Sequence, residues 1–590
     1  MATNAELSER FEEFASILEI LGANAFKVLA FRKVARALDA LATDAKDLVK
    51  MPGALEAVEG IGASSAAKIH EFVETGAIAE LDELRGQVPA GLLDLLEISG
   101  LGPKTIAQLW KERGVVDKAS LKAKLASGEL AGMKGFGAKK LENIAESIAL
   151  SEASAGRIRL GEALTIAEEV LAMMERVEGV ERVAYAGSLR RGRETIGDID
   201  ILCAARDPDT AHAAFRAQPG VAKVLVSGDT KTSVMTTRGV QIDLRTLPKA
   251  SFGAALMYFT GSKEHNVKLR ERAISMGFRL NEYGLFPDDG KDAPQHRGVV
   301  PIVSATEEEV FAALGLGFVP PELREDRGEV PVAETRSLPT LIEVGDLRAE
   351  LHAHTRASDG VMTIDELILA AQAKGHHTIA ITDHSKSSVQ ANGLSPERLR
   401  EHIRAVREAA TRHPSMQVLA GSEVDILIDG RLDYDDDLLG ELDIVVASPH
   451  ASLKQEPALA MKRLLKAIEH PATRILGHPT GRIINGRPGL DIAINELVAA
   501  AKEHDVALEI NANPMRLDLR DTHVRAAVEG GALIAINCDS HHPDHLDFAR
   551  FGILTARRGW LTAERCVNTW APDAIRRWLR RARCGNGSQG

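Results

Sequence analysis

The stretch GSLRRGRETIGDIDIL, residues 187–202, decides the fold of the middle of the chain, because it is typical of a turn that leads into a half-buried strand. Side chains alternate between the two faces of a strand, so Asp198 and Asp200 share one face. The segment VQIDLR, residues 240–245, repeats the alternation and contributes Asp243. Such carboxylates repel one another unless a cation lies between them. Three aspartates on neighbouring strands therefore predict a site for two Mg²⁺ ions.

These aspartates have a second interpretation, because a lone D-x-D pair is frequent on solvated strands. The G-S-x-x-R-G motif at 187–192 and the apolar residues around Asp243 favour the metal site. Together they resemble the nucleotidyltransferase superfamily, which includes poly(A) polymerases and antibiotic-modifying enzymes. The segments YFTGS (258–262) and GFRLNEY (277–283) are similar to the thumb of family X DNA polymerases. This resemblance covers the chain up to about residue 320.

The family X resemblance implies roles for individual residues. Asp198, Asp200 and Asp243 would be catalytic and would hold the two Mg²⁺ ions. The residues implied at the incoming nucleotide are Arg157, Gly187, Ser188, Arg191 and Gly197 near the triphosphate, Tyr258, Phe259 and Gly261 near the sugar, Asn266 at the base, and Arg270 at the templating strand. Core packing is the alternative explanation for the Tyr-Phe pair.

Three Gly-apolar-Gly turns lie between apolar helical segments near the start of the chain. They are Gly60/Gly62, Gly100/Gly102 and Gly135/Gly137. Glycine permits a tight hairpin, and the backbone N–H groups at the start of the next helix can bind a phosphate. A glycine-capped helical connection explains any single copy equally well. Three copies resemble helix-hairpin-helix elements, which grip DNA backbones without reading sequence.

The first of these turns and the segment AFRKVA (30–35) resemble the small N-terminal domain of DNA polymerase beta relatives. The resemblance implies that Lys27 binds a 5′-phosphate and that Lys68 forms a Schiff base with an abasic sugar, which is a lyase hypothesis. The chain departs from the family at Ser64, where a second lysine is often found, and at Phe31, where a tyrosine is common. An ordinary phosphate-contacting or exposed lysine is the alternative for Lys68.

The second half of the chain has a different pattern. Residues 319–346 are rich in proline, glutamate and arginine with little periodicity, which predicts an extended linker. Beyond them, apolar runs alternate with amphipathic segments such as 364–373 and 396–410, which predicts βα units and a parallel sheet or barrel. The runs expected as strands are 347–351, 378–382, 418–420, 442–447, 474–476, 508–510 and 533–536. All but the run ending at Asn511 lead to a metal-ligand residue type, and such positions gather on one rim of a barrel.

Most of the ligand-type residues belong to the segments LHAHT (351–355), TDHS (382–385), SPH (448–450), GHP (477–479) and CDSH (538–541), and Asp359 and Glu423 lie outside them. These segments resemble the PHP (polymerase and histidinol phosphatase) domain, a distorted seven-stranded barrel. The resemblance implies up to three Mn²⁺ or Zn²⁺ ions, held by His352, His354, Asp359, His384, Glu423, His450, His478, Asp539 and His541. Nitrogen and carboxylate donors suit these ions better than Mg²⁺. Any one of these histidines alone would more often be a helix cap or a core residue.

These patterns predict a multidomain chain, since 590 residues exceed what one hydrophobic core supports. The expected fold combines a helical helix-hairpin-helix N-terminal region, an α+β nucleotidyltransferase palm and thumb, and a C-terminal distorted (β/α)7 PHP barrel. The predicted domains are 1–85 (lyase-like helix-hairpin-helix), 86–151 (helix-hairpin-helix), 152–248 (palm), 249–318 (thumb), 319–346 (linker), 347–576 (PHP phosphoesterase) and 577–590 (basic tail).

Composition places few further limits on function. The net charge of −12 does not exclude DNA, because DNA contact needs a local basic or backbone-donor surface. No apolar run approaches the roughly 18 residues that span a bilayer, so no membrane association is expected. The four scattered cysteines argue against a disulfide framework and a thiolate zinc site. Residues 1–14 are polar and acidic, so no secretory signal is expected and a cytoplasmic location is predicted.

Three functional hypotheses follow. The first is a monomeric DNA-directed DNA polymerase that uses dNTPs to fill gaps in base-excision repair, acts on gapped or primer-template DNA, and carries a metal-dependent 3′-5′ exonuclease in its PHP domain. This arrangement resembles bacterial and archaeal family X polymerases. The second is a DNA-binding scaffold in which only the PHP phosphoesterase is active. The third places the hydrolase on a small phosphate monoester.

Overall fold

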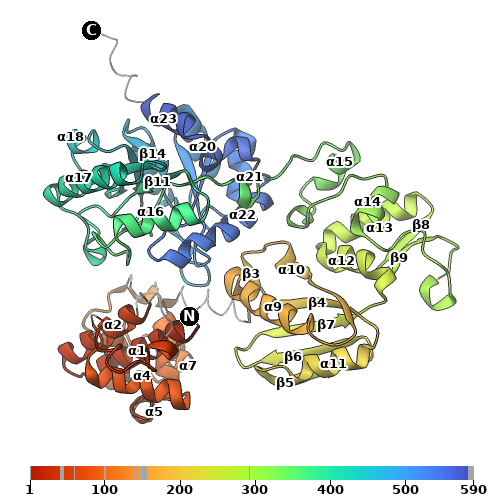
Figure 1. The fold of residues 1–590 in the computed structure, drawn as a ribbon, viewed down its shortest axis with the longest axis horizontal. Coiled ribbons are helices and arrows are strands. Elements are labelled where there is room, and N and C mark those ends of the chain that lie inside the picture. The colour runs from red at the N-terminus through yellow and green to blue at the C-terminus, as the bar shows by residue number, and fades with distance from the viewer. Residues whose placement is uncertain are drawn as a thin grey trace, which may run out of the picture. The chain divides into compact units, whose positions relative to one another are not determined.

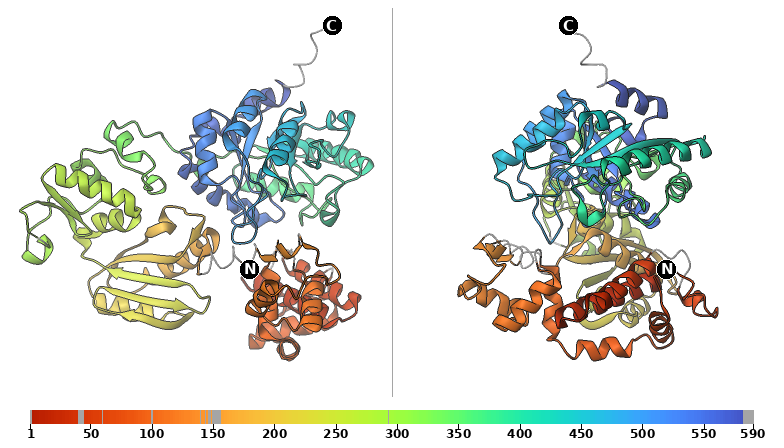
Figure 2. Two further views of the ribbon diagram at one scale, coloured as in Figure 1. Left: turned by 180° about the vertical axis from the view of Figure 1, so that it is seen from behind. Right: turned by 90° about the vertical axis from the view of Figure 1, so that its left-hand side faces the viewer.

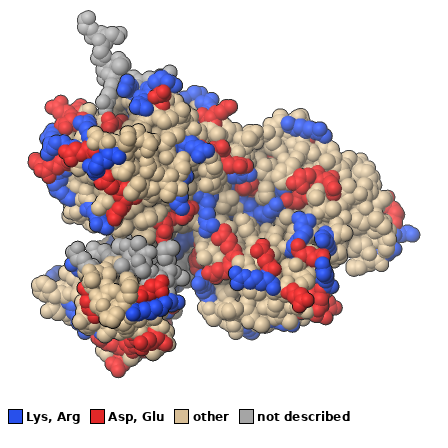
Figure 3. Space-filling view, viewed as in Figure 1, with Lys and Arg blue, Asp and Glu red and all other residues tan. Residues whose placement is uncertain are grey.

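The computed structural model describes residues 2–39, 45–58, 60–98, 101–138, 140–142, 144–145, 148, 156–291 and 293–581 (Figure 1). Its contacts divide the chain into two compact units, Met1–Ala155 with Asn485–Arg487 and Gly156–Ile484 with Pro488–Gly590. No described helix is both long and apolar enough to cross a membrane. On the face drawn in Figure 3, lysine and arginine side chains are interspersed with aspartate and glutamate.

The N-terminal part of the first unit consists of α1 (Ala2–Leu21), α2 (Ala25–Asp39), α3 (Ala45–Leu48), α4 (Ala63–Thr75), α5 (Ala79–Arg85), η1 (Ala90–Glu97), α6 (Pro103–Arg113) and α7 (Lys118–Ala126). Phe14 and Phe31 stack with ring centroids 4.7 Å apart, and Phe11 packs beside them. The same apolar core contains Ile106 and Leu121, so the boundary predicted at residue 85 separates residues that share one core.

The second unit begins with a five-stranded palm sheet in the order β2-β4-β7-β6-β5. Its elements are β1 (Ile158–Arg159), α9 (Leu160–Met174), β2 (Val180–Tyr185), α10 (Gly187–Arg190), β3 (Thr195–Ile196), β4 (Asp198–Ala205), α11 (Pro208–Ala217), β5 (Val221–Ser227), β6 (Lys231–Thr236) and β7 (Gln241–Thr246). Ile199 and Ile201 are fully buried in a core shared with α9 and α11. Because side chains alternate, Asp198 and Asp200 lie on the opposite face, as the pattern predicts.

The thumb follows as η2 (Lys249–Ser251), α12 (Phe252–Thr260), α13 (Lys263–Ser275), β8 (Phe278–Asn281), β9 (Gly284–Pro287), η3 (Pro294–Arg297) and α14 (Glu307–Ala313). The antiparallel pair β8–β9 packs with α12 and α13 around one apolar core, which includes Met257, Leu269 and Leu285. The buried side chains Leu202 and Ala204 of β4 pack against α12. The palm face that bears the aspartates therefore continues directly into the thumb.

The prediction of an extended linker over 319–346 is wrong. This segment contains η4 (Pro321–Leu323), α15 (Glu329–Glu334) and η5 (Val344–Asp346), and its apolar residues join the thumb core. Three of its charged residues, Glu322, Arg324 and Glu329, are buried. Arg324, which is 0% exposed, is paired with Glu307 at 2.5 Å. Glu329 lies 2.6 Å from His265 of α13. Charge and proline content suggested solvent exposure, whereas ion pairing permits burial.

Seven parallel strands then form a sheet in sequential order, β10 to β16. They are β10 (Ala349–Glu350), β11 (Thr378–Ile381), β12 (Gln417–Asp425), β13 (Ile444–Ser448), β14 (Thr473–Leu476), β15 (Ala507–Asn511) and β16 (Leu533–Asn537). A parallel bridge joins Ala353 to Ser540, beyond the ends of β10 and β16, so the barrel is nearly closed. Figure 2 gives two further views of the chain, with the barrel in green to blue. The predicted seven-stranded barrel is confirmed.

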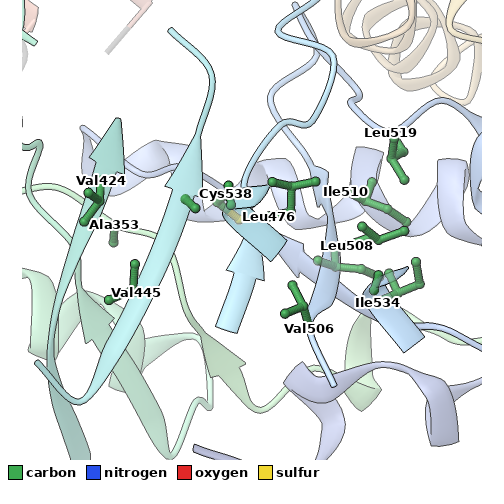
Figure 4. Close-up of a cluster of buried hydrophobic side chains, with 14 of the residues drawn as sticks. Ala353, Val424, Val445, Leu476, Val506, Leu508, Ile510, Leu519, Ile534 and Cys538 are labelled. Atoms are coloured by element: carbon green, nitrogen blue, oxygen red, sulfur yellow. The ribbon is translucent and has the colours of Figure 1, made fainter. Parts of the chain in front are cut away.

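Helices surround this barrel. They are α16 (Ile364–Ala373), η6 (Val389–Ala391), α17 (Pro396–Arg412), α18 (Asp436–Leu439), α19 (Pro457–Ile468), α20 (Ile494–Glu503), α21 (Asp521–Gly530), η7 (Pro543–Phe548), α22 (Ala549–Arg558), η8 (Ala563–Arg565), η9 (Val567–Thr569) and α23 (Pro572–Arg581). Figure 4 shows side chains such as Val445, Leu508 and Ile534, which belong to one buried cluster with residues of these helices.

A second barrel cluster contains Leu351, Ile475 and, from α23, Trp578 and Leu579. Trp578 is 4% exposed and Leu579 is 7% exposed. The division predicted at residue 576 therefore falls inside a helix that belongs to the barrel. The arginines of this helix suggested a basic tail, but its apolar side chains are buried. Residues 582–590 of the predicted basic tail lie outside the described residues.

Candidate metal centres

Three aspartates form the first candidate centre. β4 carries Asp198 and Asp200, β7 carries Asp243, and one ligand atom of each lies within 4.8 Å of the others. The parallel pairing of the two strands sets Asp200 directly opposite Asp243. Burial, and then repulsion by Asp198 and Asp243, raises the pKa of Asp200 to about 7. This concentration of oxygen donors and negative charge fits Mg²⁺.

Two further residues hold Asp243, and sequence reasoning missed both. Lys231 Nζ lies 2.5 Å from Asp243 Oδ2, and Gln241 Nε2 donates a hydrogen bond of 2.9 Å to Oδ1. Burial opposes the ionised form, yet these hydrogen bonds lower the pKa of Asp243 below its ordinary value. Only the register of β6 with β7 brings Lys231 next to this carboxylate, so no local pattern could have identified it.

The loop expected at the triphosphate lies beside the aspartates. Gly187 begins α10 with φ of 61°, and a Cβ at this position would collide with the Asp200 carboxylate. Glycine is therefore required both for the backbone conformation and for the close approach. Ser188 lies in α10, and Arg191 follows as its C-cap.

Arg157 lies at the same edge of the palm. Its Nη2 donates a hydrogen bond of 2.5 Å to the Thr195 carbonyl oxygen. A Cβ added to Gly197 would lie 3.0 Å from Arg157 Nη1, so the structure brings these two predicted nucleotide contacts together.

The thumb residues predicted to select the nucleotide lie at the junction of α12 and α13. Tyr258 and Phe259 are half-buried and pack edge to face with ring centroids 5.5 Å apart. Asn266 Nδ2 donates to the Tyr258 carbonyl oxygen at 2.6 Å, and Gly261 leaves no room for a Cβ beside Asn266. Arg270 is exposed one turn further along α13.

The second candidate centre lies at the carboxyl ends of the barrel strands. The residues form three overlapping groups, and within each group one candidate ligand atom of every residue lies within 4.8 Å of the others. The groups are His354, Asp359, His384 and His541; His352, His354 and Asp539; and His384, Glu423 and His450. His478 Nε2 lies 2.8 Å from Glu423 Oε1, so the ninth predicted ligand adjoins the third group. Glu423 lies within β12 rather than after it, because that strand continues to Asp425.

The chemistry of these atoms fits bound divalent ions. His352 Nε2, both ring nitrogens of His354, Glu423 Oε2 and Asp539 Oδ1 are buried and make no hydrogen bond to any described group. Buried polar atoms normally have partners, so this cluster of donor atoms fits a set of metal ligands. Burial lowers the pKa of His384, but Glu423 and Asp359 more than compensate and raise it to about 11. A metal ion would replace that proton.

Glu509, Asp425 and Asn511 contact the predicted ligands, and the sequence patterns did not single out Glu509 or Asp425. Glu509 Oε1 lies 2.8 Å from His352 Nδ1, and Glu509 Oε2 accepts from the His478 backbone N–H at 2.7 Å. Asp425 contacts His450 Nδ1. Asn511, noted earlier only as a strand end, donates to Asp539 Oδ2 at 3.0 Å. Such contacts fix the ring orientation of metal-binding histidines.

The predicted DNA contacts of the first unit are partly described. Gly62 and Gly102 are the N-caps of α4 and α6. Gly60 and Gly135 have φ of 104° and 83°. A Cβ at Gly137 would meet open space. Gly100 lies outside the described residues. Lys68 Nζ lies 2.9 Å from Glu80 Oε2, and Lys27 Nζ lies 3.5 Å from Glu80 Oε1.

The fold and the two sets of donor residues define a class of protein. Its members have helix-hairpin-helix elements, followed along the chain by a nucleotidyltransferase palm and thumb and then by a metal-dependent PHP barrel. Comparison with known families agrees. The matches are DNA polymerase beta palm (157–251), DNA polymerase beta thumb (255–325), PHP domain (350–513), helix-hairpin-helix domain (2–78) and SAM-like helix-hairpin-helix tandem (92–149). The chain belongs to the family X DNA polymerases that carry a PHP domain.

Three relatives illustrate this membership. The DNA polymerase/3′-5′ exonuclease PolX of Bacillus subtilis (strain 168) is 38% identical over 573 residues, which are 97% of this chain and 98% of that protein. DNA polymerase lambda of Rattus norvegicus is 27% identical over 55% of this chain and 56% of its own length. A "probable phosphatase" of Shewanella sp. (strain ANA-3) is 30% identical over 32% of this chain and 75% of its own length.

Proposed function

We propose that this protein is a DNA-directed DNA polymerase that fills short gaps during base-excision repair and removes 3′ nucleotides with its PHP domain. The observation that carries the proposal is the presence of two complete donor sets, the aspartate cluster of the palm and the histidine-rich rim of the barrel, in one compact unit. The relative from Bacillus subtilis, whose name combines both activities, supports it.

In the polymerase reaction, Asp198, Asp200 and Asp243 would hold two Mg²⁺ ions. Bound there, these ions would neutralise the triphosphate and favour ionisation of the primer hydroxyl. Arg157, Ser188 and Arg191 would hold the phosphate oxygens. Gly187 permits the nucleotide-binding loop to approach Asp200, which keeps the phosphates close to the carboxylates.

Nucleotide selection would fall to the thumb. Tyr258 and Phe259 would flank the deoxyribose, Asn266 would contact the minor-groove edge of the base, and Arg270 would contact the templating strand. The hydrogen bond from Asn266 to the Tyr258 carbonyl supports this arrangement, because it ties the base-contacting residue to the sugar-contacting pair.

In the hydrolytic reaction, the nine barrel ligands would hold up to three Mn²⁺ or Zn²⁺ ions. These ions would supply Lewis-acid activation of the phosphodiester and of a water molecule. Glu509, Asp425 and Asn511 would keep His352, His450 and Asp539 aimed at the centre. The mixed nitrogen and oxygen donors favour Mn²⁺ or Zn²⁺ over Mg²⁺.

Gapped or primer-template DNA and dNTPs would be the substrates of a monomer. The glycine turns at Gly60/Gly62, Gly100/Gly102 and Gly135/Gly137, with Lys27 and Lys68, would bind the DNA backbone. The lyase hypothesis for Lys68 has a direct test: borohydride reduction with an oligonucleotide that carries an abasic site should trap a covalent adduct in the wild type and none in Lys68→Ala.

The central test uses a duplex with a one-nucleotide gap. Asp198→Ala/Asp200→Ala should abolish dNTP incorporation and retain 3′ nucleotide release, and His352→Ala/His354→Ala should do the reverse. Each variant serves as the folding control of the other. Normal gap filling by the first variant would refute the palm assignment, and normal nuclease activity in the second would refute the barrel assignment.

A second candidate function for the barrel is hydrolysis of small phosphate monoesters. The Shewanella relative described as a phosphatase favours it, since the match covers 75% of that protein. The nuclease and phosphatase functions are distinguished by measuring kcat/KM for single-stranded DNA and for p-nitrophenyl phosphate with the same enzyme and metal. A higher kcat/KM for DNA supports the nuclease, and a higher value for the monoester supports the phosphatase.

A further inference from the structure

The loop that carries Arg191 is held by a helix of the hydrolase barrel. Leu554 of α22 packs against this loop so closely that a Cβ at Gly192 would lie 3.1 Å from Leu554 Cβ. At the end of α22, Arg558 Nη1 donates a hydrogen bond of 2.7 Å to the Arg191 carbonyl oxygen. The PHP barrel therefore contacts the backbone of the predicted triphosphate site directly.

A chain of ion pairs joins the same residues through their side chains. Glu325 Oε1 accepts from Arg191 Nε at 3.0 Å and from Arg558 Nη1 at 2.9 Å. The opposite side of the Arg558 guanidinium donates through Nε and Nη2 to Asp521, at 3.0 and 2.8 Å. Arg558 is thus fixed by its own barrel and in turn fixes the partner of Arg191.

Burial makes this network rigid. The side chains of Arg558, Glu325 and Arg191 are only 3%, 8% and 12% exposed. Arg191 Nη1 also donates to the Thr260 carbonyl oxygen at 2.8 Å. These bonds engage Nε and Nη1 of Arg191 and so fix the plane of its guanidinium. Arg193 Nη1 lies 3.6 Å from the same Glu325, so three arginines surround one carboxylate and the network keeps a positive charge.

We propose that Arg558, a residue of the hydrolase barrel, is a positioning residue for nucleotide binding by the polymerase. It holds Glu325 and the Arg191 backbone so that the Arg191 guanidinium meets the triphosphate of the incoming dNTP. The inference rests on the proposed polymerase function. It goes beyond that function by assigning part of the dNTP affinity to the PHP domain.

The test compares dNTP KM and kcat for gap filling in full-length Arg558→Met and Arg550→Met. Arg550 lies on the same helix and also joins palm to barrel, 2.9 Å from Glu168, but it does not contact the Arg191 loop. Because the Arg550 side chain is 41% exposed and that of Arg558 only 3%, Arg550→Met controls for the loss of an arginine of α22 and of one palm–barrel ion pair. Because a displaced binding group costs on the order of tenfold or more, we expect Arg558→Met to raise the dNTP KM about tenfold with a smaller change in kcat.

Three further variants keep the test decisive if Arg558→Met folds poorly, which its unfolding temperature and nuclease rate would reveal. Glu325→Gln leaves Arg558 in place and should raise KM in the same way. Arg558→Lys keeps the charge but cannot bridge all three partners, so its KM should fall between wild type and Arg558→Met. The double variant Glu325→Gln/Arg558→Met should show no larger KM than the worse single variant, since both changes break one network.

The inference would be overturned by equal dNTP KM values in the Arg558→Met and Arg550→Met variants, or by a wild-type KM in Glu325→Gln. Neither result would contradict gap filling by the wild type. A wild-type enzyme that incorporates no dNTP would overturn the proposed polymerase function, and this inference with it.

Discussion

Replacing Asp200 by asparagine should stabilise the metal-free protein at neutral pH. The fold raises the pKa of Asp200 from 3.8 to about 7, mainly through burial and then through Asp198 and Asp243. Between these two pKa values the folded protein binds a proton that the unfolded chain has lost. Stability therefore decreases as the pH rises through this interval, and the full cost is present above the folded pKa.

The structure sets the size of this effect. The rise of the Asp200 pKa from 3.8 to about 7 corresponds to about 4 kcal/mol of unfavourable interaction above pH 7. Asparagine has nearly the same shape as aspartate and no charge, so Asp200→Asn removes this cost. We expect the variant to unfold several degrees higher, because 1 kcal/mol moves Tm by about 2–4 °C in a domain of about 150–250 residues.

The assay is thermal unfolding in a chelator at several pH values between about pH 5 and about pH 8. The difference in Tm between Asp200→Asn and wild type should widen as the pH rises. Added Mg²⁺ should stabilise the wild type more than the variant, because only the wild type gains a partner for its carboxylate. A Tm difference that does not change with pH, or a variant that unfolds earlier at the highest pH, would refute the reasoning.

Asp243→Asn is the matched control. The Asp243 carboxylate is paired with Lys231 at 2.5 Å, and these contacts lower its pKa. A depressed pKa stabilises the fold above the unfolded pKa, so this variant should be less stable than wild type near pH 8. Two aspartates of one cluster are thus expected to respond in opposite directions to the same chemical change.

Three other substitutions test separate parts of the structure. Glu509→Gln weakens the orientation of a histidine ligand and should lower metal affinity at the barrel about 10–100-fold by calorimetric titration, with gap filling unchanged; unaltered affinity would contradict the role of Glu509. Glu307→Ala leaves Arg190 and Arg324, which lie 2.6 and 2.5 Å from the Glu307 carboxylate, without their partner. It should cost about 3–5 kcal/mol in denaturant unfolding, whereas a cost below about 1 kcal/mol would show that the pairs contribute little. Gly187→Ala directs a Cβ at Asp200 and should abolish dNTP incorporation while nuclease activity persists; normal incorporation would exclude the close approach.

Local periodicity was enough to predict where the palm aspartates and the barrel strands lie. Asp198 and Asp200 share a face because alternation along one strand is a property of the backbone itself. Likewise, parallel strands of a barrel end on one rim, so most apolar runs predicted where a candidate ligand lies. The exceptions are Glu423, which lies inside β12, and the run that ends at Asn511. The metal-ligating roles of these residues remain predictions that the variants above test.

The residues that support the sites could not be found in this way. Lys231 reaches Asp243 only through strand register, and Glu509 contacts His352 across the barrel interior. Residues 319–346 were misjudged for a related reason. Their charges predicted a solvated linker, but Arg324 is buried because Glu307, from another element, pairs with it. Partners distant in sequence decide whether a charged residue is exposed, and a single sequence does not reveal them.

Helix α23 has a consequence for the order in which the hydrolase matures. Its residues Ile575, Trp578 and Leu579 share a buried cluster with barrel side chains such as Leu351 and Ile475. During synthesis all seven strands leave the ribosome before this helix does, so the apolar floor of the barrel faces water until translation reaches α23. The barrel therefore cannot bury this cluster before α23 has been synthesised, which is after the palm and the thumb.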